Sequence, residues 1–157
     1  MGIVILPGKS AKNVSWYYEA KKMFADFEFV KYNHWKNEKF NYKEDLKQVK
    51  EFLKKDSAVI GKSLGAVYAM TSENVKVRVL CGLPLMFARV MGFDLLKLLN
   101  ETKVKTLVIQ NENDPSGKFS AIKVSNPNVE LVKLDGDTHD YSLKEIYSMA
   151  DSKGYFN

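Results

Sequence analysis

A chain of 157 residues is long enough to bury a core and short enough to form one domain, which we expect to span residues 1–157. Hydrophobic residues make up 45% of the chain and charged residues 27%, which excludes wholesale disorder, and no apolar run reaches the roughly 20 residues of a membrane span. The net charge of +5 comes mostly from scattered lysines, a pattern that is typical of a solvated surface and not of a nucleic-acid site.

The single cysteine, Cys81, excludes an internal disulfide and is expected to be a small buried hydrophobe. The first residues enter an apolar run directly and do not resemble a signal peptide, so we expect a cytoplasmic protein. Two well-separated histidines and one cysteine show no metal-ligand spacing. No metal or other cofactor is therefore expected.

Short apolar runs alternate along the chain with stretches of helical periodicity. In chain order we expect a strand over 2–6, a helix over 14–26, a strand over 29–32, a helix over 42–55, a strand over 57–60, a helix from Gly65 to about Asn74, a strand over 75–81, a helix over 94–100, a strand over 104–109, a short helix after Lys118, a strand over 129–134 and a helix over 141–151. Polar interruptions mark the second and the last strand as edge strands. The aromatic residues of the first helix are expected to be core.

This alternation predicts a parallel sheet with right-handed crossovers and helices on both faces, which is a three-layer α/β/α sandwich. Residues 33–41 and 82–102 interrupt the pattern, the first as a polar loop and the second as an irregular, apolar connection. In such sheets functional groups gather at the carboxyl ends of the strands. The loops after the first, third, fifth and sixth strands are therefore the places to look for chemistry.

The third strand stops at Gly61, and a helix begins at Gly65, with Ser63 at the apex of the turn. This is the Gly-x-Ser-x-Gly pattern of a nucleophile elbow, in which a strained turn holds a serine hydroxyl above the sheet. Glycine suits positions 61 and 65 because a side chain there would strike the opposite limb of the turn. The alternative is an ordinary connection in which Ser63 is a helix N-cap.

Two further candidate groups follow later strands, Asp114 after the fifth and His139 after the sixth. The order Ser, Asp, His is that of the α/β-hydrolase triad and differs from the orders in chymotrypsin and subtilisin. A serine hydroxyl is a poor nucleophile at neutral pH, so His139 would take its proton while an anionic Asp114 orients the imidazole. Glu112 is the reserve acid, and Asp114 could instead only begin a turn before Pro115.

Four motifs in register carry a resemblance to a known family: Pro7-Gly8 after the first strand, the elbow, Asp114-Pro115, and Gly136-Asp137-Thr138-His139. With them the chain resembles a minimal α/β-hydrolase and is similar to the small single-domain serine hydrolases typified by retinoblastoma-binding protein nine. The resemblance covers almost the whole chain and implies a six-stranded sheet of order 2-1-3-4-5-6 without a large cap. Lys62 inside the elbow departs from the family pattern, which leaves the substrate open.

Acyl transfer requires two backbone N–H donors for the tetrahedral intermediate. One should be the amide of Leu64 and the other an amide of the loop after the first strand, that of Lys9 or, as the alternative, that of Ser10. Tentative substrate-pocket residues are Ser10, Lys62, Leu83, Leu85 and Met86. The apolar stretch 83–88 would line an acyl pocket, form a small lid or serve as a partner surface.

The hypothesis is a serine hydrolase that cleaves a small ester or thioester through an acyl-serine intermediate, as a monomer or a homodimer. One alternative is a hydrolase-fold protein that binds a partner and has little activity. Another is a nucleotide-binding P-loop at one of the Gly-Lys-Ser triplets, 8–10 and 61–63. That pattern needs a glycine at positions that hold Ile3 and Asp56, so neither triplet fits it.

Overall fold

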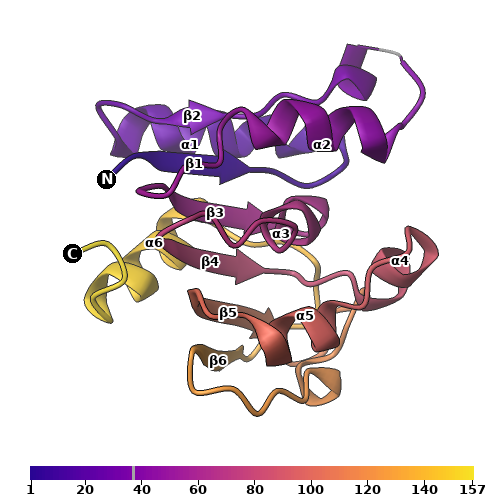
Figure 1. The fold of residues 1–157 in the computed structure, drawn as a ribbon, viewed down its shortest axis with the longest axis vertical. Helices are drawn as coiled ribbons and strands as arrows, with labels where there is room; N and C mark the ends of the chain where they lie inside the picture. Colours follow the sequence, from indigo (N-terminus) through magenta and orange to yellow (C-terminus); the bar gives the residue numbers. More distant parts are fainter. Residues whose placement is uncertain (37) are drawn as a thin grey trace.

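The computed structural model describes residues 1–36 and 38–157, and within these ranges strands and helices alternate along the chain (Figure 1). The elements are β1 (Ile3–Leu6), η1 (Ala11–Asn13), α1 (Val14–Met23), β2 (Glu28–Phe29), η2 (Asn33–Lys36), α2 (Tyr42–Lys50), β3 (Ala58–Lys62), α3 (Leu64–Ala69), β4 (Val77–Cys81), α4 (Leu85–Val90), α5 (Leu95–Glu101), β5 (Lys105–Asn111), η3 (Phe119–Ala121), β6 (Val129–Leu134) and α6 (Leu143–Ser152), where η denotes a 3-10 helix. None of the helices described is long and apolar enough to cross a membrane.

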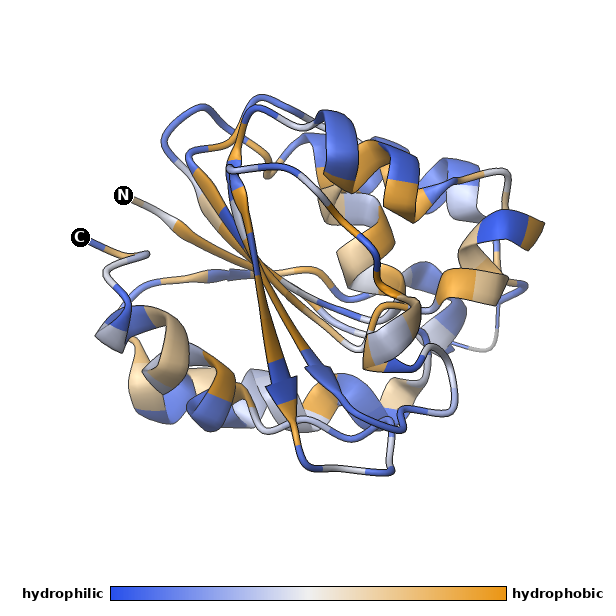
Figure 2. Ribbon diagram, turned by 90° about the horizontal axis from the view of Figure 1, so that it is seen from below, coloured by the Kyte–Doolittle hydropathy of each residue, from blue (hydrophilic) through white to orange (hydrophobic). Residues whose placement is uncertain are grey.

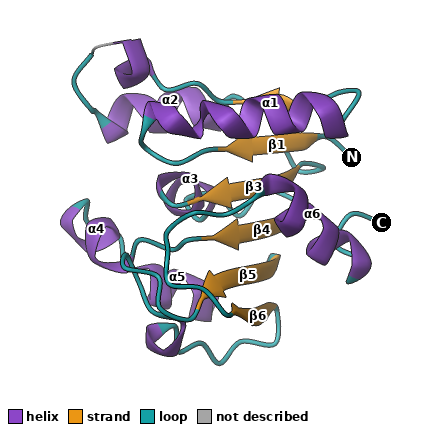
Figure 3. Cartoon of the chain, turned by 180° about the vertical axis from the view of Figure 1, so that it is seen from behind, coloured by secondary structure: helices purple, strands orange, loops and turns teal. Residues whose placement is uncertain are grey.

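The strands form one parallel, six-stranded sheet in the order β2-β1-β3-β4-β5-β6. This order confirms the expected fold class, and β2 and β6 are the edge strands, as their polar interruptions indicated. Helices cover both faces of the sheet, and Figure 3 shows α1 and α6 on the face turned toward the viewer. The molecule is therefore a three-layer α/β/α sandwich.

The core lies on both sides of the sheet because neighbouring residues of a buried strand point to opposite faces. In β1, Val4 and Leu6 pack toward α2 and α3, whereas Ile5 packs toward α1 and α6. Apolar residues accordingly run continuously through the central strands, which Figure 2 shows from the edge of the sheet with helices on either side. The continuous apolar runs in the sequence thus reflect burial on two faces.

Three helices differ from the sequence-based expectation. The first ends at Met23 rather than at residue 26, because Phe24 turns to an extended conformation and packs edge-on against Tyr147 at 4.9 Å between ring centroids. The second ends at Lys50 rather than at residue 55, in a tightened turn in which Glu51 N–H bonds to Gln48 O. The helix after the elbow ends at Ala69 instead of near residue 74.

The connection 82–102 is more regular than expected, since α4 lies within the stretch that was predicted to be irregular. Conversely, the strand expected over 29–32 is only Glu28–Phe29, and η2 occupies part of the expected loop over 33–41, of which residue 37 lies outside the described residues. The helix expected after Lys118 is the single turn η3. These differences change element lengths and leave the sheet order intact.

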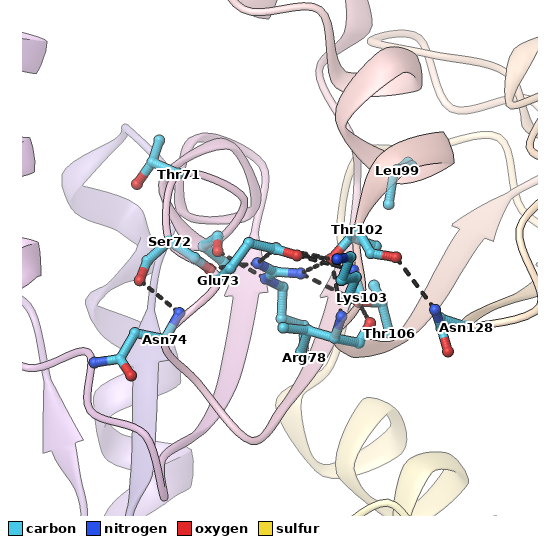
Figure 4. A network of polar contacts seen from close by, with 12 residues as sticks. Thr71, Ser72, Glu73, Asn74, Arg78, Leu99, Thr102, Lys103, Thr106 and Asn128 are labelled. Atoms are coloured by element: carbon cyan, nitrogen blue, oxygen red, sulfur yellow. Dashed lines mark hydrogen bonds and ion pairs between the residues drawn. The ribbon is translucent and has the colours of Figure 1, made fainter.

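A buried polar network explains why α3 stops early (Figure 4). Arg78 on β4 is fully buried, and its guanidinium donates to the carbonyl of Ala69 at 2.8 Å and to that of Ser72. It also pairs with Glu73 at 2.5 Å and donates to the hydroxyl of Thr102 at 2.8 Å. The arginine thus satisfies carbonyls that the end of a helix leaves free, a tertiary contact that local propensity does not reveal.

We expect Glu73→Ala to lower the free energy of unfolding by about 2 to 3 kcal/mol, because it leaves the Arg78 charge buried without a counter-ion. The expected loss is smaller than for a fully buried ion pair, because the Glu73 side chain is 52% exposed. Urea unfolding measures the change. The matched control is Glu112→Ala, whose partner Lys133 is 3.8 Å away and half exposed, and which should cost less than about 0.5 kcal/mol. Equal losses in the two variants would contradict this account.

Candidate active site

The loops that follow β1, β3, β5 and β6 meet at one edge of the sheet, because parallel strands end on the same side. Ser63 lies directly after β3, in a backbone conformation with φ of 53° and ψ of −117°. Among the described residues other than glycine, it alone has a positive φ. Such a conformation is strained for a serine and persists only where the surrounding structure holds it.

The two glycines of the elbow allow this strained turn. A Cβ on Gly61 would lie 2.8 Å from the carbonyl oxygen of Gly65, and a Cβ on Gly65 would overlap the carbonyl of Leu6 on β1. Glycine at these positions lets the end of β3 and the start of α3 pass close to each other and to β1. Ser63 makes no side-chain capping bond to α3, so its hydroxyl does not act as an N-cap.

The structure brings Ser63, His139 and Asp114 into one hydrogen-bonded line. His139 Nε2 lies 2.8 Å from Ser63 Oγ, and His139 Nδ1 lies 3.0 Å from each carboxylate oxygen of Asp114. Because an ionised carboxylate can only accept, Nδ1 carries the proton, and the lone pair of Nε2 faces the serine hydroxyl. The imidazole is 32% exposed and the carboxylate is fully buried, so of these two groups only the histidine is in contact with solvent.

Two residues that sequence reasoning did not single out, Ser116 and Tyr141, complete the surroundings of Asp114. Ser116 donates to Asp114 Oδ1 through its N–H at 2.8 Å and its hydroxyl at 2.7 Å, and Tyr141 donates to Oδ2 at 2.7 Å. Burial by itself raises the pKa of Asp114, but the hydrogen bonds from His139, Tyr141 and Ser116 outweigh it, so that the pKa is held below its usual value. Asp114 is therefore an anion at neutral pH.

The acids that neighbour Asp114 or His139 in the sequence are placed differently. Glu112 is half exposed and faces Lys133 on β6. Asp137 and Asp140 are exposed, and Asp140 lies at the edge of the hollow above Ser63. Of the acids named, only Asp114 contacts the imidazole.

Two groups of backbone donors adjoin Ser63. Leu64 begins α3, so its N–H lies in the first turn of the helix and points out of it. Lys9 and Ser10 belong to the loop after β1, and their N–H groups, like that of Leu64, bond to no acceptor among the residues that the structure describes. Lys9 and Ser10 line the hollow that contains Ser63 and His139, and Leu64 follows Ser63 directly in the chain.

That hollow has a volume of about 840 Å³, and Lys9, Ser10, Lys12 and Lys62 line it. The ammonium of Lys9 lies over the rings of Phe40 and Phe87, at 4.7 and 5.3 Å from their centroids. The ammonium of Lys62 lies 5.7 Å from the ring of Trp16. Lysine side chains thus surround the serine, and cation–π contacts restrain two of them.

The expected pocket residues separate into three groups. Ser10 and Lys62 line the hollow at Ser63, whereas Leu85 and Met86 line a second hollow of about 360 Å³ between α4, α5 and the loop after β5. Leu83 is fully buried and lines neither hollow, and its N–H bonds to the side chain of Gln110. The apolar connection therefore packs partly into the core.

The described part of the chain contains no group of three or more histidine, cysteine, aspartate or glutamate side chains that could hold a metal ion. Cys81 is fully buried, which raises the pKa of its thiol and is in line with its expected place in the core. Both Gly-Lys-Ser triplets lie in the site, one in the loop after β1 and one in the elbow. The first triplet forms the loop after β1, and the second forms the turn between β3 and α3.

Solved structures with the same architecture are α/β-hydrolases. A chain from Pectobacterium atrosepticum that is named a YdeN-like hydrolase aligns at 17% identity and a TM-score of 0.73, over 96% of this chain and 89% of that one. An α/β-hydrolase enzyme from a sediment metagenome of the Mar Chica lagoon aligns at 17% identity and a TM-score of 0.65, over 99% and 90%. A serine hydrolase from the hydrocarbon-degrading bacterium Cycloclasticus zankles aligns at 14% identity and a TM-score of 0.58, over 100% and 91%.

No protein-family model matches the sequence, and no curated protein sequence matches it either. At these identities the structural likeness defines the fold. The chain has the α/β-hydrolase fold, with a six-stranded sheet in 157 residues.

Proposed function

We propose that the protein is a serine hydrolase in which Ser63, His139 and Asp114 form the catalytic triad. One observation carries this proposal: the unbroken path from Ser63 Oγ through the imidazole of His139 to the buried carboxylate of Asp114, with hydrogen bonds of 2.8 and 3.0 Å. The strained backbone of Ser63 adds support, because strain of this kind gathers at functional sites. The hydrolases that share the fold add support for the reaction class.

Acyl transfer would proceed in two halves. Ser63 Oγ attacks the acyl carbonyl carbon while His139 Nε2 takes its proton, and the imidazolium then gives this proton to the leaving alcohol or thiol as the carbon–leaving-group bond breaks. Water then attacks the acyl-serine while the same nitrogen takes its proton. The bond between the acyl carbon and Ser63 Oγ breaks, His139 returns the proton to Oγ, and a carboxylic acid is released. Asp114 stays ionised throughout and stabilises the imidazolium through Nδ1.

The developing oxyanion needs donors that are already in place, and we assign them to the N–H groups of Leu64 and Lys9, with Ser10 adjacent. Esters and thioesters are the proposed substrates, because alkoxide and thiolate groups leave more readily than the nitrogen of an amide. Ser10 and Lys62 line the site of the acyl substrate in this proposal. We further propose the single-domain serine hydrolase type, with no cofactor, a cytoplasmic location and a monomeric or homodimeric state.

The direct test is the intact mass of the protein after exposure to a fluorophosphonate, which reacts with activated serines. We expect one adduct per chain, and peptide mapping should locate it at Ser63. Folded protein that gains no adduct would favour a binding protein of the same fold, for which the exposed side chains of Met86 and Val90 on α4 offer a surface.

A further inference from the structure

Three aromatic residues before and within η2 bind the backbone of the loop that follows β1. The hydroxyl of Tyr32 donates to the carbonyl of Pro7 at 2.6 Å. His34 Nε2 and Trp35 Nε1 both donate to the carbonyl of Lys9, at 2.6 and 2.8 Å. These donors come from a segment about 25 residues further along the chain, so they are a tertiary feature of the loop. We call Tyr32, His34 and Trp35 the carbonyl clamp.

The clamp binds two peptide groups of the loop, and the peptide group that carries the Lys9 N–H lies between them. The Pro7 carbonyl belongs to the peptide between residues 7 and 8, and the Lys9 carbonyl to the peptide between residues 9 and 10. The peptide between residues 8 and 9 carries the Lys9 N–H, and it is thus restrained from both sides. The described chain has no cis peptide bonds, so the N–H of each peptide points opposite to its carbonyl.

This loop needs an outside restraint because it contains Gly8, whose backbone is free to rotate. A rotated peptide would turn a carbonyl oxygen, in place of an N–H, toward Ser63 and would repel a developing oxyanion. The next carbonyl, that of Ser10, is also engaged, because the backbone and side-chain N–H groups of Asn13 both donate to it at 2.9 Å. Three carbonyls of the loop therefore have donors, whereas the N–H groups of Lys9 and Ser10 have no acceptor among the described residues.

The rings of the clamp pack against one another. The rings of Tyr32 and His34 stack at 5.5 Å with 13° between their planes, and Trp35 meets Tyr32 edge-on at 5.6 Å. A carbonyl oxygen only accepts, so His34 Nε2 carries a proton in both the neutral and the charged imidazole. His34 consequently cannot use Nε2 as a base toward substrate, in contrast to His139.

We propose that His34 and Trp35, supported by Tyr32, are positioning residues that hold the Lys9 loop with its N–H groups facing the oxyanion. This inference rests on the proposed serine hydrolase function. It assigns a task to a segment that is far from the catalytic motifs in sequence. It also explains why consecutive ring N–H donors converge on a single carbonyl oxygen: two bonds resist rotation of that peptide better than one.

The test compares His34→Leu and Trp35→Phe with the wild-type protein. Each variant removes one N–H donor and keeps an apolar side chain in its place. We expect kcat for ester hydrolysis and the rate of fluorophosphonate labelling to fall about 10-fold in each variant, and about 100-fold in the double variant, with KM nearly unchanged. His34→Gln, whose amide N–H can reach the same carbonyl, should recover most of the rate.

The matched control is Gln48→Leu, which removes a side-chain bond of 3.0 Å to the carbonyl of Lys31, next to the clamp but outside the Lys9 loop. It should leave kcat unchanged. The thermal unfolding temperature of every variant shows whether a lower rate comes from loss of the fold or from a misoriented Lys9 loop. If the wild type is labelled and the double variant keeps the wild-type kcat and labelling rate, the positioning role of the clamp is wrong while the proposed function stands. The same holds if Gln48→Leu loses as much activity as the clamp variants. Absence of labelling in the wild type would overturn the proposed function itself.

Discussion

Ser63→Ala and His139→Ala should each lower ester hydrolysis by about 10⁴- to 10⁶-fold, and the double variant should be no slower than the worse single variant. The reason is that the two groups act as one unit: Ser63 Oγ and His139 Nε2 share the 2.8 Å hydrogen bond through which the proton moves. Once either group is lost, the other has no proton to exchange. The measurements are kcat/KM for an aryl ester and the rate of fluorophosphonate labelling.

Ser152→Ala is the matched control, because its hydroxyl bonds to the carbonyl of Met149 at the end of α6. Its kcat/KM should equal that of the wild type. Losses that multiply in the double variant would show that Ser63 and His139 act independently, and the triad assignment would then be wrong. A Ser63→Ala protein that still gains the adduct would point to a different nucleophile.

Gly65→Ala should be strongly disruptive, lowering the free energy of unfolding by more than about 3 kcal/mol and removing measurable labelling of Ser63. Its added methyl group would overlap the carbonyl carbon and oxygen of Leu6, which are backbone atoms at the carboxyl end of β1. Neither β1 nor α3 can move away without opening the sheet or displacing the elbow. Urea unfolding and labelling at equal protein concentration measure the two effects.

Gly2→Ala makes the same chemical change at a position where an added Cβ meets nothing within 4 Å. It should alter stability by less than about 0.5 kcal/mol. If Gly2→Ala and Gly65→Ala lowered the free energy of unfolding equally, the loss at Gly65 would come from the replacement of glycine by alanine in general and not from the clash with Leu6. A stable Gly65→Ala protein with full labelling would mean that the elbow tolerates a side chain, and the close approach of β1 and α3 would not be needed for function.

The parallel sheet was predictable because the periodicity of its strands and helices is local in sequence, whereas its strand order was expected from the resemblance to minimal α/β-hydrolases. Strands buried on both faces need continuous apolar runs, and connections between neighbouring parallel strands are right-handed, so few topologies remain open. The positions of Ser63, Asp114 and His139 after three of these strands were also predictable. Their hydrogen-bonding distances and the burial of Asp114 come from the structure alone.

Other features escaped prediction because their causes lie far away in the chain. The early end of α3 depends on Arg78 of β4, which binds the freed carbonyls. The hydrogen bonds that Ser116 and Tyr141 make to Asp114 require the loops after β5 and β6 to meet. A serine two residues after an Asp-Pro pair was the available signal, but such a serine is common in turns.

The sequence by itself determined the architecture and the sites of the chemical groups, since periodicity, glycine and proline act within a few residues. Only the tertiary structure decided how those groups are held: which acid faces His139, where the apolar residues 83–88 pack, and that His34 and Trp35 bind the Lys9 carbonyl. The physical reason is that a hydrogen bond depends on positions within a few tenths of an ångström. Packing of the whole chain sets those positions, and no short stretch of residues specifies them.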